Sequence, residues 1–395
     1  MLYFVLTVWV VAFAVSFLTT PAIRRAAPWL GLVDLPGHRK VHVTPTPMGG
    51  GIAVALGLAI PIVIAAFWPD ADGSASSNEP NLVTNVVTHL LAVREAVFAS
   101  SDVAWQMAGI LVGAVILFFT GLADDRWNLS WKLRLGLQIA IAAGVVLCGV
   151  RATVFVTVPW VGFGVTVLWI LVLTNAMNFL DNMDGLSAGI GVIAASMTVG
   201  ILLVMVKEPF WPVAFLLLLL SGSLTGFLIW NKPPASIFMG DSGSNLIGFL
   251  LATLTICGTF YERSGSRHVI LAPLCVLAVP LYDFVTVIWI RLRAGRSPFH
   301  GDKSHFSHRL VELGLRPSRA VLTIHLATLM TGLAGLLLYK VADWTGAWLL
   351  ISLIFCVLAM ISILETVGRR SLANQAAETS NGDADATTES VATSS

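Results

Sequence analysis

The segment that decides the fold class is Trp211-Pro-Val-Ala-Phe-Leu-Leu-Leu-Leu-Leu-Ser-Gly-Ser-Leu-Thr-Gly-Phe-Leu-Ile-Trp230, which contains no charged residue. A helix of about 20 apolar residues matches the thickness of the hydrocarbon core of a bilayer. A polar loop follows at once, Asn231-Lys-Pro-Pro-Ala-Ser-Ile-Phe238-Met-Gly240-Asp241. The stretch therefore predicts a membrane-spanning helix with reactive side chains at its end.

The composition of the whole chain agrees with this interpretation. Of 395 residues, 56% are hydrophobic and 11% are charged, whereas a soluble domain has about 25% charged residues. A net charge of +1 without a basic stripe gives no sign of nucleic-acid binding. The four cysteines lie isolated in apolar segments, without the spacing of metal ligands. The sequence predicts an integral membrane protein.

Apolar runs of suitable length predict an all-α, polytopic fold with about eleven transmembrane helices. The first run has its basic residues after it, which favours an uncleaved helix over a signal peptide. The predicted spans cover residues 3–23, 49–68, 105–122, 133–150, 160–178, 186–206, 211–230, 243–260, 269–290, 320–340 and 345–367.

Basic residues orient these spans. With eleven spans, 17 of the 23 Lys and Arg residues fall on one side and 6 on the other, and the basic side of a membrane protein is cytoplasmic. We expect the N-terminus outside and the C-terminus in the cytoplasm. We also expect one transferase domain over residues 1–370, a disordered tail over 371–395, and a short helix at Leu82–Phe98 within an external loop, 69–104.

Polar clusters then fall at the cytoplasmic ends of the spans. Asp124 and Asp125 close the third span. Adjacent carboxylates repel each other, so a cation or a proton-transfer role would explain them. A solvated helix end would explain them equally well.

A second cluster follows the fifth span. Asn175, Asn178, Asp181 and Asp184 are spaced three residues apart, which places them on one side of a continuing helix. Two amides and two carboxylates suit a nucleotide, the water shell of a metal ion, or both. The alternative is a helix end with polar caps.

Two further clusters complete the set. Gly240-Asp241-Ser-Gly243 begins the eighth span, where glycines permit close approach of a ligand and helix amides favour anions. Its likeness to a serine-protease motif is rejected because that motif needs a β-barrel. The basic loop around His305-Phe-Ser-His308-Arg309 suits a diphosphate, although the positive-inside rule alone also produces such loops.

In order and spacing, these clusters resemble the polyprenyl-phosphate N-acetylhexosamine-1-phosphate transferases of glycosyltransferase family 4, which include the bacterial undecaprenyl-phosphate GlcNAc-1-phosphate transferases. The resemblance covers roughly residues 1–340. It rests on five motifs: Asp34-Leu-Pro…Arg39-Lys40-Val-His42…Pro47-Met-Gly-Gly50, Gly121-Leu-Ala-Asp-Asp125, Asn175-Ala-Met-Asn-Phe-Leu-Asp-Asn-Met-Asp-Gly-Leu186, Phe238-Met-Gly-Asp-Ser-Gly-Ser244, and Arg296-Ser-Pro-Phe…Asp302…His305…His308-Arg-Leu310.

The resemblance implies transfer of an N-acetylhexosamine 1-phosphate, with GlcNAc 1-phosphate as the favoured case, from a UDP-sugar to undecaprenyl or another polyprenyl phosphate. The reaction would release UMP at the cytoplasmic face of the plasma membrane and serve cell wall or lipopolysaccharide synthesis. It implies Mg²⁺, with Mn²⁺ as an alternative, and allows a homodimer. The implied residues are Asp124, Asp125, Asp181 and Asp184 for catalysis, Asp241 and Asp184 for the metal, and Lys132, Asn175, Asn178, Asn231, Phe238, His305, His308 and Arg309 for substrates.

The chain departs from the family pattern at two places. Ser307 stands where the motif usually has one histidine of a pair, and Asn182-Met183 is less usual between Asp181 and Asp184. These departures concern the sugar preference more than the reaction. The alternatives are a phospho-N-acetylmuramoyl-pentapeptide transferase, a multispan transporter with ion-binding carboxylates, and an inactive scaffold.

Overall fold

The computed structural model describes residues 1–36, 44–67, 82–152, 158–206, 209–261, 267–298, 302 and 304–366. Within them the chain is nearly all helical, with one two-stranded antiparallel ribbon in which Val33 pairs with Pro47. The predicted tail, 371–395, and the Arg39-Lys40-Val-His42 motif lie outside these residues.

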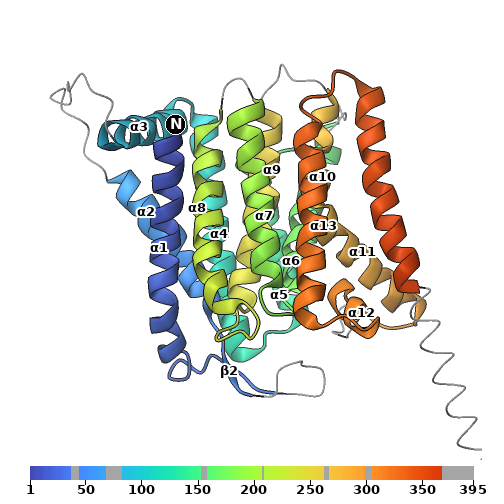
Figure 1. Cartoon of the computed structure of the whole chain (residues 1–395). Helices are drawn as coiled ribbons and strands as arrows, with labels where there is room; N and C mark the ends of the chain where they lie inside the picture. Colours follow the sequence, from blue (N-terminus) through green and yellow to red (C-terminus); the bar gives the residue numbers. More distant parts are fainter. Residues whose placement is uncertain are drawn as a thin grey trace, which may run out of the picture.

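The long helices, among them α1, α7, α8 and α13, form a bundle with roughly parallel axes, whereas α3 lies across this direction and α11 is tilted (Figure 1). The bounds of the helices are α1 Leu2–Ala26, α2 Gly50–Ala66, α3 Leu82–Phe98, α4 Ser101–Trp127, α5 Trp131–Leu147, α6 Pro159–Leu180, α7 Leu186–Gly200, α8 Trp211–Asn231, α9 Asp241–Tyr261, α10 Ala272–Val276, α11 Ala278–Arg293, α12 Phe306–Glu312, α13 Pro317–Leu337 and a final helix Trp344–Thr366. The other described elements are the strands β1 Val33–Asp34 and β2 Thr46–Pro47, the π-helix η1 Ile201–Met205 and the 3-10 helix η2 Arg267–Leu271.

Eight of the described helices are long and apolar enough to cross a membrane, and the bent pair of α10 and α11 makes up to nine. Every one of the eleven predicted segments is largely helical, but α2 and α5 have only 17 residues each. The multi-pass membrane fold is thus confirmed, while the count of eleven and the orientation remain predictions. The short helix expected at Leu82–Phe98 is present as α3.

The segment predicted as one helix over 269–290 is bent by 66° between Val276 and Ala278. Pro280 lies in the first turn of α11. Its missing N–H cannot bond to the carbonyl of Val276, and its ring crowds that carbonyl, so the helix breaks there.

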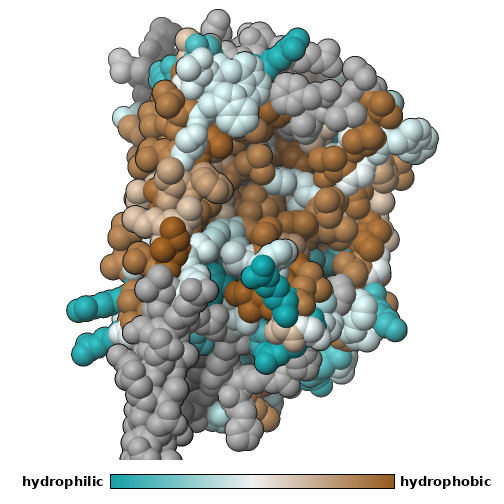
Figure 2. Space-filling model, turned by 90° about the vertical axis from the view of Figure 1, so that its right-hand side faces the viewer, coloured by the Kyte–Doolittle hydropathy of each residue, from teal (hydrophilic) through white to brown (hydrophobic). Residues whose placement is uncertain are grey.

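Helix α9 lies at the centre of the bundle. In the most apolar stretch of α9, 94% of the residues are buried inside the protein, against 6% in the corresponding stretch of the final helix. It packs against α2, α4, α6, α7 and α8. The outward faces of the surrounding helices are apolar, as Leu18 and Leu353 illustrate, and Figure 2 shows an apolar band with hydrophilic side chains gathered below it. Such a band suits contact with lipid.

Candidate active site

Polar residues from distant segments surround one cavity of about 620 Å³, a usual size for a small-molecule site. It opens among the ends of α6, α8 and α9, near β2 and α12, at the end of the bundle opposite the N-terminus (Figure 1). Its lining includes Asp34, Thr46, Asp125, Asp181, Asn182, Met183, Asp184, Asn231, Phe238, Gly240, Asp241, Asp302, His305 and His308. Members of all four predicted polar clusters therefore meet at one place.

Asp125 closes the N-terminus of α9. Its carboxylate accepts hydrogen bonds from the backbone N–H groups of Asp241 at 2.6 Å and Ser242 at 3.1 Å. Gly240 adopts a φ of +78°, and a Cβ there would lie 2.6 Å from Asp125 Oδ2. The carboxylate thus fills the space that the glycine leaves, where it satisfies amides that a helix N-terminus leaves unpaired.

Asp241 lies between an amide and a guanidinium group. Asn178 Nδ2 donates to Asp241 Oδ1 at 2.8 Å, and Arg134 Nη1 donates to Asp241 Oδ2 at 2.9 Å. The same Arg134 nitrogen also forms an ion pair with Asp124, which is only 6% exposed. Arg134 thereby joins two carboxylates that are 117 positions apart in the chain.

Arg134 is the functional candidate that sequence reasoning missed. The sequence predicted Lys132 instead. The Lys132 ammonium lies 5.8 Å from the centre of the ring of its neighbour Trp131, and Lys132 is not among the described residues that line the cavity. The signal that could have revealed Arg134 is its position one helical turn into α5, directly after the polar segment that follows Asp124 and Asp125.

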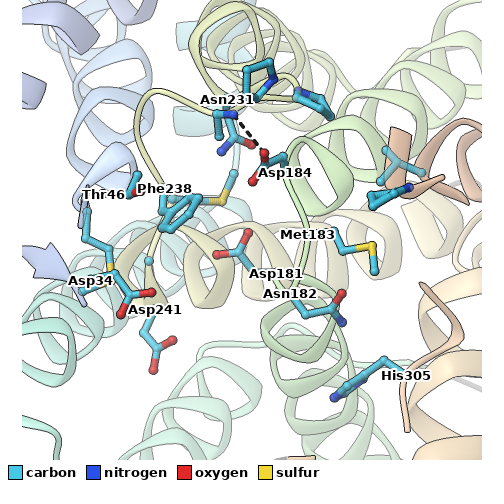
Figure 3. A pocket seen from close by; sticks show the side chains of 18 of the residues that line it. Asp34, Thr46, Asp181, Asn182, Met183, Asp184, Asn231, Phe238, Asp241 and His305 are labelled. Atoms are coloured by element: carbon cyan, nitrogen blue, oxygen red, sulfur yellow. Dashed lines mark hydrogen bonds between the residues drawn. The ribbon is translucent and has the colours of Figure 1, made fainter. Parts of the chain in front are cut away.

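Asp181 and Asp184 occupy the turn between α6 and α7. Burial, assisted by the nearby charges of Asp125 and Asp184, raises the pKa of Asp181 to about 7, although a hydrogen bond from the Gly240 backbone opposes this. Asp184 Oδ2 accepts the N–H of Ala235 at 2.9 Å, the dashed line in Figure 3. In this view Asp181 lies centrally, between Phe238 and Met183 (Figure 3).

Two predicted substrate amides are engaged within the protein. Asn231 is 4% exposed, and it accepts from Gly185 N–H at 3.0 Å while donating to Ile237 O at 2.9 Å. Asn175 donates to Gln138 at 2.7 Å and does not line the cavity. Asn231 thus holds the loop that bears Phe238 against the start of α7, and its predicted contact with the nucleotide remains a prediction.

The histidine segment is placed by a buried network of hydrogen bonds. His305 and His308 line the cavity, and His305 Nδ1 lies 3.0 Å from Asp283 Oδ2. Arg309, by contrast, is 2% exposed and pairs with Glu365 of the final helix at 3.0 Å. The phosphate contact predicted for Arg309 receives no support from these partners and remains a prediction.

Asp302 precedes His305 by three residues and also lines the cavity. Burial by itself would raise the pKa of Asp302, but hydrogen bonds from Arg291 and Ser304 outweigh it and lower the pKa. Asp302 is therefore a stable anion, and it holds the Arg291 guanidinium through Nε and Nη2 at 3.2 and 3.0 Å.

The two departures from the family pattern contact each other. Ser307 Oγ donates to Asn182 Oδ1 at 2.6 Å, and Asn182 Nδ2 donates to Phe179 O at 2.6 Å. Ser307 is completely buried. The hydrogen bond between Ser307 and Asn182 therefore connects α12 to the segment that contains Asp181 and Asp184.

The donor chemistry of the cavity fits a divalent cation. Among the described residues no group of three His, Cys, Asp or Glu side chains converges as a ready-made metal site. Mg²⁺ does not require one, because it is usually held by one or two carboxylates together with substrate phosphates and water. Asp184 and Asp241 both line the cavity and offer such carboxylates.

Comparison with known proteins gives consistent results. The family model described as "Glycosyl transferase family 4" matches residues 107–259, a range that includes Asp124, Asp181 and Asp241. The chain is 31% identical over 359 residues to a probable undecaprenyl-phosphate N-acetylglucosaminyl 1-phosphate transferase of Bacillus subtilis, covering 87% of this chain and 89% of the relative.

Two further relatives bear similar names. A decaprenyl-phosphate N-acetylglucosaminephosphotransferase of Mycobacterium tuberculosis is 35% identical over 336 residues, which are 79% of this chain and 77% of the relative. An undecaprenyl-phosphate alpha-N-acetylglucosaminyl 1-phosphate transferase of Escherichia coli K12 is 26% identical over 328 residues, covering 80% and 78%. All three relatives thus match across most of their length.

Proposed function

This chain belongs to glycosyl transferase family 4, and we propose that it transfers N-acetylglucosamine 1-phosphate from UDP-GlcNAc to a polyprenyl phosphate, releasing UMP. The observation that carries the proposal is the convergence of Asp125, Asp181, Asp184 and Asp241 on one cavity at the end of an apolar bundle. A lipid phosphate can reach such a cavity from the bilayer, while a nucleotide sugar can enter from water.

In the proposed reaction an oxygen of the lipid phosphate attacks the phosphorus that bears the sugar. One P–O bond forms, the P–O bond to UMP breaks, and UMP leaves with the bonding electrons. The lipid phosphate is already ionised at neutral pH, so the protein contributes mainly by positioning two anions and by neutralising their charge.

The basic groups of the site suit this task. Arg134 pairs with Asp241 and Asp124, and we propose that its guanidinium also contacts the lipid phosphate. Lys132, on the same first turn of α5, would add a second positive charge. Arg suits such a position because its guanidinium binds carboxylate and phosphate with the same geometry.

Asp241 and Asp184 would hold Mg²⁺ or Mn²⁺. The ion, when bound, would neutralise phosphate charge and act as a Lewis acid. The chain's own side chains would do the rest: Asn178 orients Asp241, Phe238 lies where it can contact the uracil end, and His305 and His308 face the diphosphate or sugar. Asp124 or Asp125 remains a candidate base, and Asp181 lines the cavity, between Phe238 and Met183 in the view of Figure 3.

We place the active site on the cytoplasmic face of the plasma membrane, and we treat residues 1–370 as one transferase domain. The support is the distribution of Lys and Arg, 17 of which lie on the side of the site if eleven spans are present. The relatives' names differ in the length of the polyprenyl group, so undecaprenyl phosphate is proposed as the first acceptor to test.

Release of UMP by the purified protein tests the proposal. The assay contains UDP-GlcNAc, undecaprenyl phosphate and Mg²⁺, and we expect release to require all three and to be lost in Asp241→Asn. The matched control is Asp343→Asn, because Asp343 is exposed and only caps the start of the final helix. The proposal fails if the wild type releases no UMP, or if Asp241→Asn and Asp343→Asn are equally active.

A further inference from the structure

One buried carboxylate has no part in the sequence-predicted clusters. Asp283 lies within α11 among apolar residues, and its side chain is 0% exposed. An unpaired carboxylate in such a place would be costly. Its two oxygens must therefore have hydrogen-bond partners that offset the free-energy cost of burying the charge.

Both oxygens contact the histidine segment. Asp283 Oδ1 accepts the backbone N–H of Phe306 at 2.6 Å, and Asp283 Oδ2 lies 3.0 Å from His305 Nδ1. A carboxylate can only accept, so the proton of the second bond belongs to His305 Nδ1. Asp283 thus contacts the ring of His305, which lines the cavity, and the backbone of the next residue, Phe306.

The remaining nitrogen of His305 faces a cation. Arg291 Nη2 lies 3.5 Å from His305 Nε2, and Arg291 is itself held by Asp302. The guanidinium carbon of Arg291 lies 5.1 Å from the centre of the Phe179 ring, and this ring makes a T-shaped contact with the His305 ring. Because Nε2 faces a donor, a neutral imidazole protonated at Nδ1 fits both of its neighbours.

We propose that Asp283 is a positioning residue that keeps the His305 proton on Nδ1, so that Nε2 accepts from Arg291 and the ring is held in one orientation at the cavity wall. The proposal rests on the proposed function, which places the sugar or diphosphate beside this ring. A carboxylate that orients an imidazole in this way is a frequent device in enzymes, because it fixes both the tautomer and the ring orientation.

A purely structural role must be separated from this one. The bond from Phe306 N–H to Asp283 Oδ1 could by itself dock α12 against α11. Asp283→Asn separates the two roles, because the amide oxygen still accepts from Phe306 while the amide nitrogen donates toward His305 Nδ1. That donor requires Nδ1 to be an acceptor, so the ring must carry its proton on Nε2.

The first measurement is nitrogen NMR of the histidine side chains in the purified full-length protein, with His305→Gln used to assign the signal. We expect the Nδ1-protonated tautomer in the wild type and the Nε2-protonated tautomer in Asp283→Asn. The same tautomer in both proteins would overturn the proposal. This readout needs no substrate, so it holds even if the proposed reaction is wrong.

The second measurement is steady-state kinetics of UMP release. We expect kcat of Asp283→Asn to fall roughly 10- to 100-fold, as is usual when the partner of an active-site histidine is removed, with a much smaller change in KM for the nucleotide sugar. The matched control is Glu365→Gln, which also converts a buried carboxylate bonded to α12 into an amide but contacts Arg309.

The two variants give distinct outcomes. Glu365→Gln should lower the thermal stability as much as Asp283→Asn does, yet keep the wild-type tautomer of His305. Equal loss of kcat in both variants, with no change of tautomer in either, would mean that Asp283 serves only the packing of α12. Absence of UMP release in the wild type would instead refute the proposed function.

Discussion

Replacement of Gly240 by alanine tests whether the Asp125 carboxylate and the start of α9 form one unit. The residue has a φ of +78°, and an added Cβ would lie 2.6 Å and 2.8 Å from the two oxygens of Asp125. The methyl group must displace this carboxylate, which accepts the N–H groups of Asp241 and Ser242. At least one of these hydrogen bonds should then break.

Gly295 offers a matched control. Its φ is +66°, but a Cβ there would meet no atom of the described residues within 4 Å. Gly295→Ala should therefore cost only the left-handed backbone conformation, about 1 kcal/mol. A hydrogen bond to a charged group contributes about 1.5–3 kcal/mol, so Gly240→Ala should cost about 2 kcal/mol more than the control, or roughly 30-fold in the unfolding equilibrium.

The free energy of unfolding can be measured for both variants in mixed micelles with increasing denaturing detergent, followed by circular dichroism. UMP release should also fall in Gly240→Ala and remain near the wild-type rate in Gly295→Ala, because only the former displaces a residue that lines the cavity. Equal stability losses in the two variants would refute the argument, since they would show that Asp125 moves aside without cost.

Three further predictions concern single contacts. Asn231→Asp should lower the free energy of unfolding by about 1–3 kcal/mol, the cost of leaving a buried carbonyl unpaired; an unchanged stability together with a raised KM for the nucleotide sugar would instead indicate direct substrate contact. Ser307→Ala and Asn182→Ala should be coupled by about 1 kcal/mol in a double-mutant cycle of unfolding, and additive losses would contradict the hydrogen bond between them. Arg134→Met should raise KM for the lipid phosphate far more than KM for the nucleotide sugar, and the reverse order in steady-state kinetics would place Arg134 on the donor side.

The sequence indicated which residues belong to the candidate site better than it indicated which groups those residues contact within the protein. Asp125, Asp181, Asp184 and Asp241 all line the cavity, and each was visible as a polar residue at the edge of an apolar run. Such residues stand out because a carboxylate is costly in hydrocarbon, so several of them at the ends of apolar runs suggest a shared role. Chain position, however, did not distinguish Asp125, which caps α9, from Asp124, which pairs with Arg134.

Two further assignments remain predictions for a related reason. Asn231 and Arg309 have the chemistry of substrate ligands, but Asn231 joins Gly185 to Ile237 and Arg309 pairs with Glu365. Asp283 drew no attention because it is a lone carboxylate in an apolar segment. Whether a polar group faces a ligand or another part of the protein depends on neighbours that are far away in the chain.

The sequence by itself determined that this protein is a multi-pass helical membrane protein, and it determined the order of the polar clusters along the chain. These two properties can be read from short segments of the chain, because the free energy of transferring a helix into lipid depends on the side chains and backbone of that helix alone. Only the tertiary structure decided that Asp125 meets α9, that Ser307 meets Asn182 and that His305 meets Asp283. These contacts depend on how helices pack and bend, because a hydrogen bond forms only where two groups come within about 3 Å with the right orientation.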